Sequence, residues 1–133
     1  MPFSHPVAVR YLEVDAQGVV FNMWYLAYLD DAMTAFIEAG GLPYTEMAAG
    51  GYDVQLVHTE LDWKGAAGLS DRLHVDVVTQ GVGRTSFTLG FTVRRGESVL
   101  VTASTVYVCV GTDGSGSRPV APPLRQALQS ATG

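Results

Sequence analysis

The sequence MWYLAYLDDAMTAFIEA, residues 23–39, predicts a single long α-helix. It is rich in Met, Leu and Ala and contains no Gly or Pro before the terminating glycines at 40–41. Among its few polar residues, Asp31, Thr34 and Glu38 recur at spacings of three and four, whereas apolar side chains cover nearly all the remaining surface. Other parts of the fold must therefore surround this helix.

Strand patterns flank the helix on both sides. Residues 7–13 show the rough alternation of branched and aromatic side chains that predicts a half-buried strand. Four more strands are predicted after the helix, at 54–63, 72–79, 85–94 and 99–110. Because short turns separate the last three, we expect those strands to form an antiparallel meander.

These elements predict an α+β fold in which a curved antiparallel five-stranded sheet wraps one central helix. That arrangement is the hotdog fold. We expect a short connector at 43–51, a polar, glycine-rich linker at 111–116 and a short helix at 124–129. With 133 residues, the chain is predicted to be a single domain spanning 1–133, with the tail 111–133 forming a loop plus that short helix.

Composition narrows the classes of function. Thirteen acidic against eight basic residues give a net charge of −5, and no basic stripe suits nucleic acid. A polyanionic ligand such as coenzyme A needs only a few local cations and stays possible. The 47% hydrophobic content favours a homo-oligomer. One cysteine, no signal-peptide pattern and no apolar span predict a cytoplasmic protein without an internal disulfide.

The segment RYLEVDAQGVVFNMWYL, residues 10–26, resembles the signature of the 4-hydroxybenzoyl-CoA thioesterase family. Asp15, Gly18 and Tyr25 fall in that family's register at a strand-to-helix junction. Weaker likeness continues through 30–32, 63–64, 70–73, 84–87 and 119–124. The resemblance implies a hotdog enzyme that hydrolyses an acyl-CoA thioester, with coenzyme A as part of the substrate and no cofactor.

Thioester hydrolysis requires a nucleophile or an activated water, together with donors that stabilise the developing oxyanion. We expect Asp15 to act as nucleophile or general base. The amides of residues 21–23 should be unpaired donors at the helix start, supported by the helix dipole, and Asn22 supplies the central one. By resemblance, Gly18 and Tyr25 complete the catalytic set.

Each of these assignments has a structural alternative. An isolated Asp-x-x-Gly is more often a turn cap, and only the family register favours catalysis by Asp15. Asn22 is also expected to cap the helix. Trp24 and Tyr25 could line a substrate pocket, although aromatic residues on an enclosed helix are more often core. Asp30 and Asp31 are the fallback catalysts, because a mid-helix acid on an enclosed helix needs a partner.

The resemblance also assigns a coenzyme A site. In relatives the segment that matches Arg84, Thr85 and Ser86 contacts the coenzyme A phosphates, and Lys64 is a further candidate. A cation with hydroxyls suits phosphate chemically, but the alternative for this segment is a solvated turn, and Lys64 could simply be exposed. The three histidines lack metal-ligand spacing, so no metal is predicted.

Two other functions stay open at this point. A hotdog hydratase or dehydratase needs a histidine near its acid, and only His58 and His74 are available. A non-catalytic module that binds acyl-CoA or an acyl-carrier protein is the second, because a shared fold does not guarantee shared chemistry. The acyl group, the choice between free coenzyme A and a carrier protein, and the choice between a homodimer and a homotetramer are left undetermined.

Overall fold

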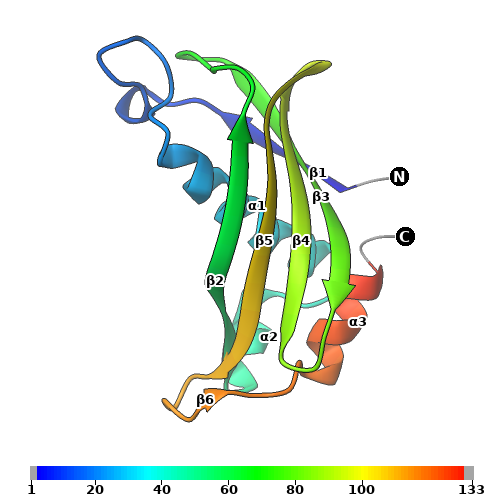
Figure 1. Ribbon diagram of the computed structural model, residues 1–133. Coiled ribbons are helices and arrows are strands. Elements are labelled where there is room, and N and C mark those ends of the chain that lie inside the picture. The colour runs from blue at the N-terminus through cyan, green and yellow to red at the C-terminus, as the bar shows by residue number, and fades with distance from the viewer. Residues whose placement is uncertain (1–2, 131–133) are drawn as a thin grey trace.

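Helix α1 (Trp24–Ala39) lies across one face of a curved antiparallel sheet in the computed structural model, which describes residues 3–130 (Figure 1). Two short helices, α2 (Tyr44–Ala49) and α3 (Pro122–Ser130), lie on the same side as α1. The strands are β1 (Phe3–Ala8), β2 (Tyr52–Trp63), β3 (Arg72–Val82), β4 (Ser86–Arg95), β5 (Ser98–Gly111) and the two-residue β6 (Gly116–Ser117). This is the hotdog arrangement predicted from the sequence.

The strand order in the sheet is β1-β3-β4-β5-β2, and β6 adds a short pairing to β5. The meander of β3, β4 and β5 is confirmed, and all pairings are antiparallel. Strand β2 lies at one edge, and its outer side pairs with no strand in the range 3–130. A 12-residue edge strand with free main-chain groups is a ready surface for another strand.

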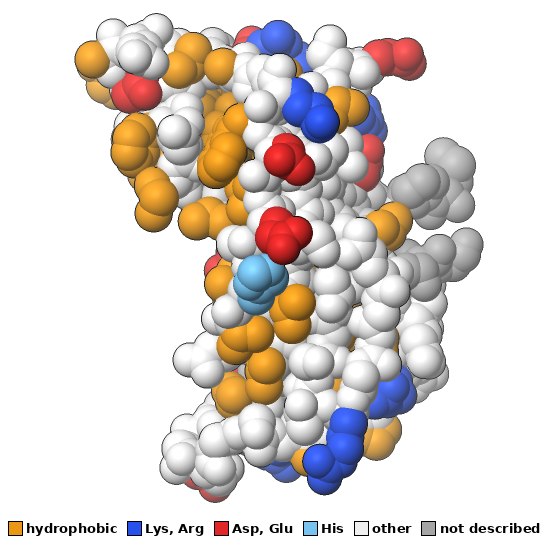
Figure 2. Space-filling model, viewed as in Figure 1, with side chains coloured by type: hydrophobic (Ala, Val, Ile, Leu, Met, Phe, Trp, Pro, Cys, Tyr) orange, Lys and Arg blue, Asp and Glu red, His pale blue; other side chains and the backbone are white. Residues whose placement is uncertain are grey.

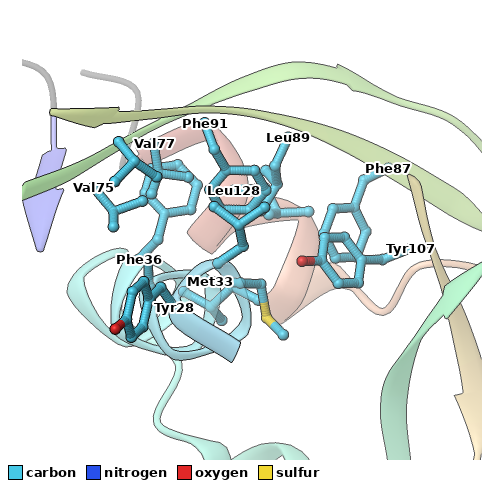
Figure 3. Packing of buried hydrophobic residues seen from close by; sticks show 14 of the residues in the cluster. Tyr28, Met33, Phe36, Val75, Val77, Phe87, Leu89, Phe91, Tyr107 and Leu128 are labelled. Carbon is cyan, nitrogen blue, oxygen red and sulfur yellow. The ribbon is translucent and has the colours of Figure 1, made fainter. Parts of the chain in front are cut away.

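The core lies between the inner face of the sheet and α1. In Figure 3, Met33 and Phe36 of the helix face Val75, Leu89 and Phe91 of the sheet, and Leu128 of α3 joins them. The expectation that α1 is surrounded holds for only part of its circumference. Its side with Asp30, Asp31 and Thr34 is exposed in the protomer.

The first strand differs from its prediction at both ends, because β1 begins at Phe3 and not at Val7, and ends at Ala8 and not at Glu13. Residues Tyr11–Glu13 form a 3₁₀ turn, η1. The Glu13 carboxylate folds back to accept a 2.9 Å hydrogen bond from the Arg10 amide, which closes this turn and ends the extended conformation.

Two connections also contain more structure than predicted. The expected connector at 43–51 holds α2, which begins directly after Pro43. The expected linker at 111–116 is a tight β5–β6 hairpin, and Gly114 adopts the left-handed backbone that its turn requires. The terminal helix begins at Pro122, slightly earlier than expected.

Candidate active site

Asp15 lies in a small hairpin between η1 and α1. Val14 and Val20 form an isolated antiparallel bridge, and the Asp15 amide donates to the Val19 carbonyl at 2.9 Å. The Gly18 amide donates to the Asp15 carbonyl at 3.0 Å, and Gly18 has φ +80°, a conformation that a side chain would strain. Gly18 therefore shapes the loop that carries the acid.

The Asp15 carboxylate is only partly engaged within the protomer. Its Oδ1 atom accepts a 2.8 Å hydrogen bond from the Gln17 amide, which is the turn-capping role weighed above. Its Oδ2 atom accepts no hydrogen bond from residues 3–130. One oxygen therefore caps the turn, and the other stays available to a ligand.

Helix α1 begins close to this hairpin, and its first amides are partly free. The Phe21 amide is paired, since it donates to the Glu13 carbonyl at 2.9 Å. The amides of Asn22 and Met23 have no acceptor in the described chain, and both residues are exposed. The expected donor set is therefore corrected from three amides to two. Met23, not Asn22, occupies the N-cap position, so Asn22 contributes an amide without capping the helix through its side chain.

Tyr25 is buried, with 1% of its surface exposed. Its hydroxyl accepts a 3.2 Å hydrogen bond from the Ala67 amide, and the Val20 amide donates to the Ala67 carbonyl at 2.8 Å. Val19 and Gly68 form a further bridge. Tyr25 thus ties α1 to the β2–β3 connection, which in turn holds the Asp15 hairpin. Its position in the core agrees with the alternative stated above, that aromatic residues on this helix are packing residues.

The β2–β3 connection is itself held by Asp71. Its carboxylate accepts from the Gly68 amide at 2.8 Å and from Arg95 at 2.7 Å, and Arg95 also donates to the Ala66 carbonyl at 3.3 Å. The Gly68 amide and the Arg95 guanidinium hold the pKa of Asp71 below its usual value, so the acid stays ionised and keeps these bonds at neutral pH.

An apolar hollow of about 370 Å³ opens beside the start of α1. It is lined by Asn22, Met23, Leu26, Thr59, Leu61 and Trp63. The residues that carry the free amides thus also line a hollow shared by the helix and the inner face of β2. Such a concave apolar site with a few polar groups suits a ligand with an apolar portion.

Apolar side chains gather around the Asp15 hairpin and the end of β2 at the upper left of Figure 2. The exposed large side chains of this end are Tyr11, Leu12, Phe21, Met23, Trp63 and Leu69. Exposed apolar patches of this kind are typical of surfaces that bind another molecule.

The predicted coenzyme A residues lie elsewhere. Arg84 and Thr85 lie in the β3–β4 turn and Ser86 begins β4, at the end of the sheet opposite the Asp15 hairpin (Figure 1). Lys64 directly follows β2 and is exposed at the Asp15 end. One protomer therefore brings Lys64, but not Arg84–Ser86, to the same end as Asp15.

Two arginines near the β3–β4 turn were not identified from the sequence. Arg125 donates to the Gly83 carbonyl at 2.7 Å, and Arg118 lies over the Tyr52 ring and donates to the Gly51 carbonyl at 3.0 Å. The Arg84 guanidinium has no hydrogen-bond partner in residues 3–130. The only available signal was the presence of two cations in the Pro-rich tail, which does not reveal their proximity to residue 84.

Asp30, one fallback catalyst, lines a separate hollow of about 200 Å³ between α1, α2 and β2. Burial raises the pKa of Asp30, and its interaction with Tyr107 lowers it by less. The buried Tyr107 hydroxyl forms no well-directed hydrogen bond in the described chain, yet it lies near enough to Asp30 for each group to shift the pKa of the other. Asp31, the other candidate, is exposed and contacts His5 at 2.8 Å.

Residues 3–130 contain no cluster of three or more metal-ligating side chains. No helix within this range is long and apolar enough to cross a membrane.

Comparison with known proteins gives one family and a consistent fold. The family described as the Thioesterase-like superfamily matches residues 9–131 of the chain. A 1,4-dihydroxy-2-naphthoyl-CoA hydrolase of Synechococcus elongatus is 25% identical over 123 residues, which cover 91% of this chain and 90% of the relative.

Two solved structures share the fold. A 1,4-dihydroxy-2-naphthoyl-CoA thioesterase from Synechocystis matches with a TM-score of 0.86 and 23% identity, covering 97% of this chain and 96% of that chain. A gentisyl-coenzyme A thioesterase matches with a TM-score of 0.88 and 19% identity, covering 95% of this chain and 99% of that chain.

Proposed function

Because the chain belongs to the thioesterase-like superfamily, we propose that its Asp15 carboxylate and the amides of Asn22 and Met23 form the active site of an acyl-CoA thioesterase. The general reaction is hydrolysis of an acyl-CoA thioester to a carboxylic acid and coenzyme A. The observation that carries the assignment is a free Asp15 Oδ2 atom in the hairpin that leads directly into α1, whose start has two unpaired amides and borders an apolar hollow.

The chemistry follows from these groups. The acyl carbonyl oxygen accepts from the two amides, which are aided by the positive end of the α1 dipole. Asp15 attacks the carbonyl carbon to form an anhydride that water then cleaves, or it takes the proton of a water that attacks directly. In either route the electrons of the C–S bond leave with sulfur. A thiol with a pKa near ~8.5 is a good leaving group, so no strong general acid is required.

The hollow beside Asn22 favours an acyl chain of substantial apolar bulk. Trp63, Leu26 and Leu61 offer flat and branched surfaces for an aromatic or branched group. Relatives named for 1,4-dihydroxy-2-naphthoyl-CoA and gentisyl-CoA act on aromatic acyl groups by those names. We therefore place aromatic acyl-CoA thioesters first among the substrates to test.

A second copy of the chain completes the site. The free edge of β2 supplies main-chain donors and acceptors, and the exposed Leu56 and Val57 add apolar surface to it. Antiparallel pairing of two β2 strands about a twofold axis reverses one sheet relative to the other. It sets the Asp15 end of one protomer beside the β3–β4 end of the other.

Coenzyme A then spans the two subunits. Arg84, Thr85 and Ser86 of the partner subunit receive its phosphates, with Arg118 and Arg125 raising the positive potential nearby. Lys64 adds a cation on the Asp15 side. Coenzyme A arrives as part of the substrate, so this chemistry needs no resident cofactor or metal.

The histidines give the hydratase alternative little support. His58 is exposed on β2, where it contacts Glu60 at 3.3 Å, and it does not line the hollow beside Asn22. His74 lies on β3 in the register opposite Pro6 and Arg94. Neither residue is placed in the hairpin or helix start that holds the candidate site.

A thiol-release screen tests the function. Short-chain, long-chain and aromatic acyl-CoA thioesters are offered to the wild-type protein, in parallel with enoyl-CoA hydration and equilibrium binding. Release of thiol, fastest with aromatic substrates, is the expected result. Hydration without thiol release would establish the hydratase, and tight binding without any turnover would establish the binding module.

A further inference from the structure

Glu13 is the most deeply buried charged side chain near the Asp15 hairpin, with 2% of its surface exposed. Its Oε1 atom accepts from the Arg10 amide at 2.9 Å and from the Tyr28 hydroxyl at 2.7 Å. Its Oε2 atom accepts from the Arg10 guanidinium at 2.8 Å and 2.7 Å. Both oxygens of the carboxylate are therefore engaged by donors of this chain, although Glu13 also lines a hollow of about 380 Å³ together with Arg10 and Tyr28.

This carboxylate is ionised at neutral pH. Burial alone raises the pKa of Glu13, but the Arg10 amide, the Tyr28 hydroxyl and the Arg10 guanidinium together bring it below its ordinary value. Hydrogen bonds to a charged acceptor are about twice as strong as neutral ones. Glu13 and Tyr28 are both buried, so the bond between them is shielded from water, whereas the Arg10 side chain is 64% exposed. Glu13 is thus a rigid junction and not a loose surface ion pair.

The junction connects the two halves of the proposed catalytic centre. Glu13 lies two residues before Asp15, and its carbonyl accepts from the Phe21 amide at 2.9 Å, closing the base of the hairpin. Its side chain bonds Tyr28, which lies on α1, the helix whose start presents the amides of Asn22 and Met23. The position of the acid relative to the oxyanion donors therefore depends on Glu13.

We infer that Glu13 is a positioning residue for the hydrolytic reaction. It holds the Asp15 hairpin against α1, so that the Asp15 carboxylate and the amides of Asn22 and Met23 can contact the same carbonyl group. The inference rests on the proposed function. Misplacement of a reacting group by about 1 Å costs up to 10²-fold in rate, so loss of this lock should slow turnover without weakening substrate binding much.

Glu13→Gln tests the inference because it keeps the shape of the side chain and removes its charge. We expect kcat per folded protein to fall about tenfold, with KM changed less than about twofold. In the Asp15→Asn background, Glu13→Gln should cause no further loss of kcat, because it acts through Asp15. A wild-type kcat in Glu13→Gln, or a full additional loss in the Asp15→Asn background, overturns the inference.

Two further variants keep the test decisive. Asp76→Asn removes a carboxylate that binds Arg94 at 2.8 Å on the sheet, away from the hairpin. It should lower stability while leaving kcat and KM unchanged.

Tyr28→Phe removes a single hydrogen-bond donor to Glu13 and provides the test if Glu13→Gln does not fold. We expect kcat to fall about threefold at constant KM, and an unchanged kcat refutes the inference. Full activity in Asp15→Asn would instead overturn the proposed function.

Discussion

The two ends of the sheet carry different chemistry. At one end, the Asp15 hairpin, the free amides of α1 and an apolar hollow lie together, surrounded by exposed apolar side chains. At the other end, Arg84 and the hydroxyls of Thr85 and Ser86 form a polar turn near two more arginines. The first end suits an acyl thioester, and the second suits phosphate.

The separation of these two ends supports the proposal that the site is built from two protomers. Strand β3 runs from one end to the other, and its 11 residues span roughly 36 Å. A single chain therefore cannot bring the acid and Arg84 to the same thioester at close range. The free β2 edge offers a way to bring opposite ends together from two copies, so the division of chemistry between the ends is an argument for assembly.

The largest expected effect follows a change at the acid end. Asp15→Asn removes the charge and keeps the turn, so kcat should fall by about 10³-fold or more while the fold and assembly persist. Turnover of the best acyl-CoA substrate and circular dichroism measure the two properties. An unchanged kcat would mean that Asp15 only caps its turn.

Asp113→Asn is the matched control for that change. The Asp113 carboxylate accepts from the Ser115 amide at 2.9 Å, the same two-residue turn that Asp15 makes with Gln17. We expect this variant to retain wild-type kcat, because it loses only a turn cap. A comparable loss in both variants would attribute the Asp15 effect to loop stability.

A change on the β2 edge should prevent two protomers from pairing, and so separate the Asp15 end of one protomer from the Arg84 end of its partner. Val57 is 54% exposed at the register shift in the middle of this strand, and Val57→Glu adds a negative charge to the edge of each copy, so that paired edges repel one another. Light scattering should show monomers. Activity should fall about 10²-fold, because the Asp15 end of each chain is no longer beside the Arg84 end of another chain. Val99→Glu, at a 40% exposed position in β5, should stay assembled and active. Full activity in a Val57→Glu monomer would refute the two-chain site.

A change at the cationic end should weaken binding more than chemistry. Arg84→Ala removes an unpaired exposed guanidinium, and a charge-assisted bond to phosphate accounts for roughly a tenfold rise in KM with kcat nearly constant. Arg72→Ala removes an exposed arginine from the opposite end of β3 as a control. Equal effects from both variants would indicate a general charge effect and not a phosphate site.

The smallest effect concerns Asp30, which lies between the two ends. Because its pKa is raised in the folded state, ionisation of Asp30 destabilises the fold, and this cost is absent at acid pH and grows as pH rises through the folded pKa. Asp30→Asn should therefore be more stable than wild type at neutral pH, and the difference should vanish below the ordinary pKa of 3.8. Urea unfolding at several pH values measures it. A collapse of kcat would instead move catalysis to the helix-borne acid.

The sequence predicted most of what local patterns control. Helix α1 and the β3–β4–β5 meander follow from periodicity and turn residues, and a loop with a tight turn at Gly18 before the helix was also expected. The Val14–Val20 bridge that makes this loop a hairpin was not predicted. The early end of β1 was missed, because a side chain, Glu13, bonds back to its own main chain and favours a 3₁₀ turn over a strand.

Tertiary relations were beyond the reach of these patterns. Nothing in the spacing of Arg84 and Asp15 reveals that they lie at opposite ends of the sheet, nor that Arg125 returns to the β3–β4 turn. Tyr25 fitted the signature, but its depth in the core depends on the β2–β3 connection packing over it. Which donors remain free at the helix start likewise depended on the Glu13 carbonyl, which occupies the Phe21 amide.

Mixing two defective proteins tests the central claim, that Asp15 of one chain works with Arg84 of another. Asp15→Asn and Arg84→Ala homodimers are combined under conditions that exchange subunits, and kcat/KM is measured at low substrate concentration. A two-chain site leaves one intact site in each heterodimer, so random exchange should restore about a quarter of wild-type activity, well above the mean of the unmixed parents. Activity equal to that mean after confirmed exchange would contradict the account.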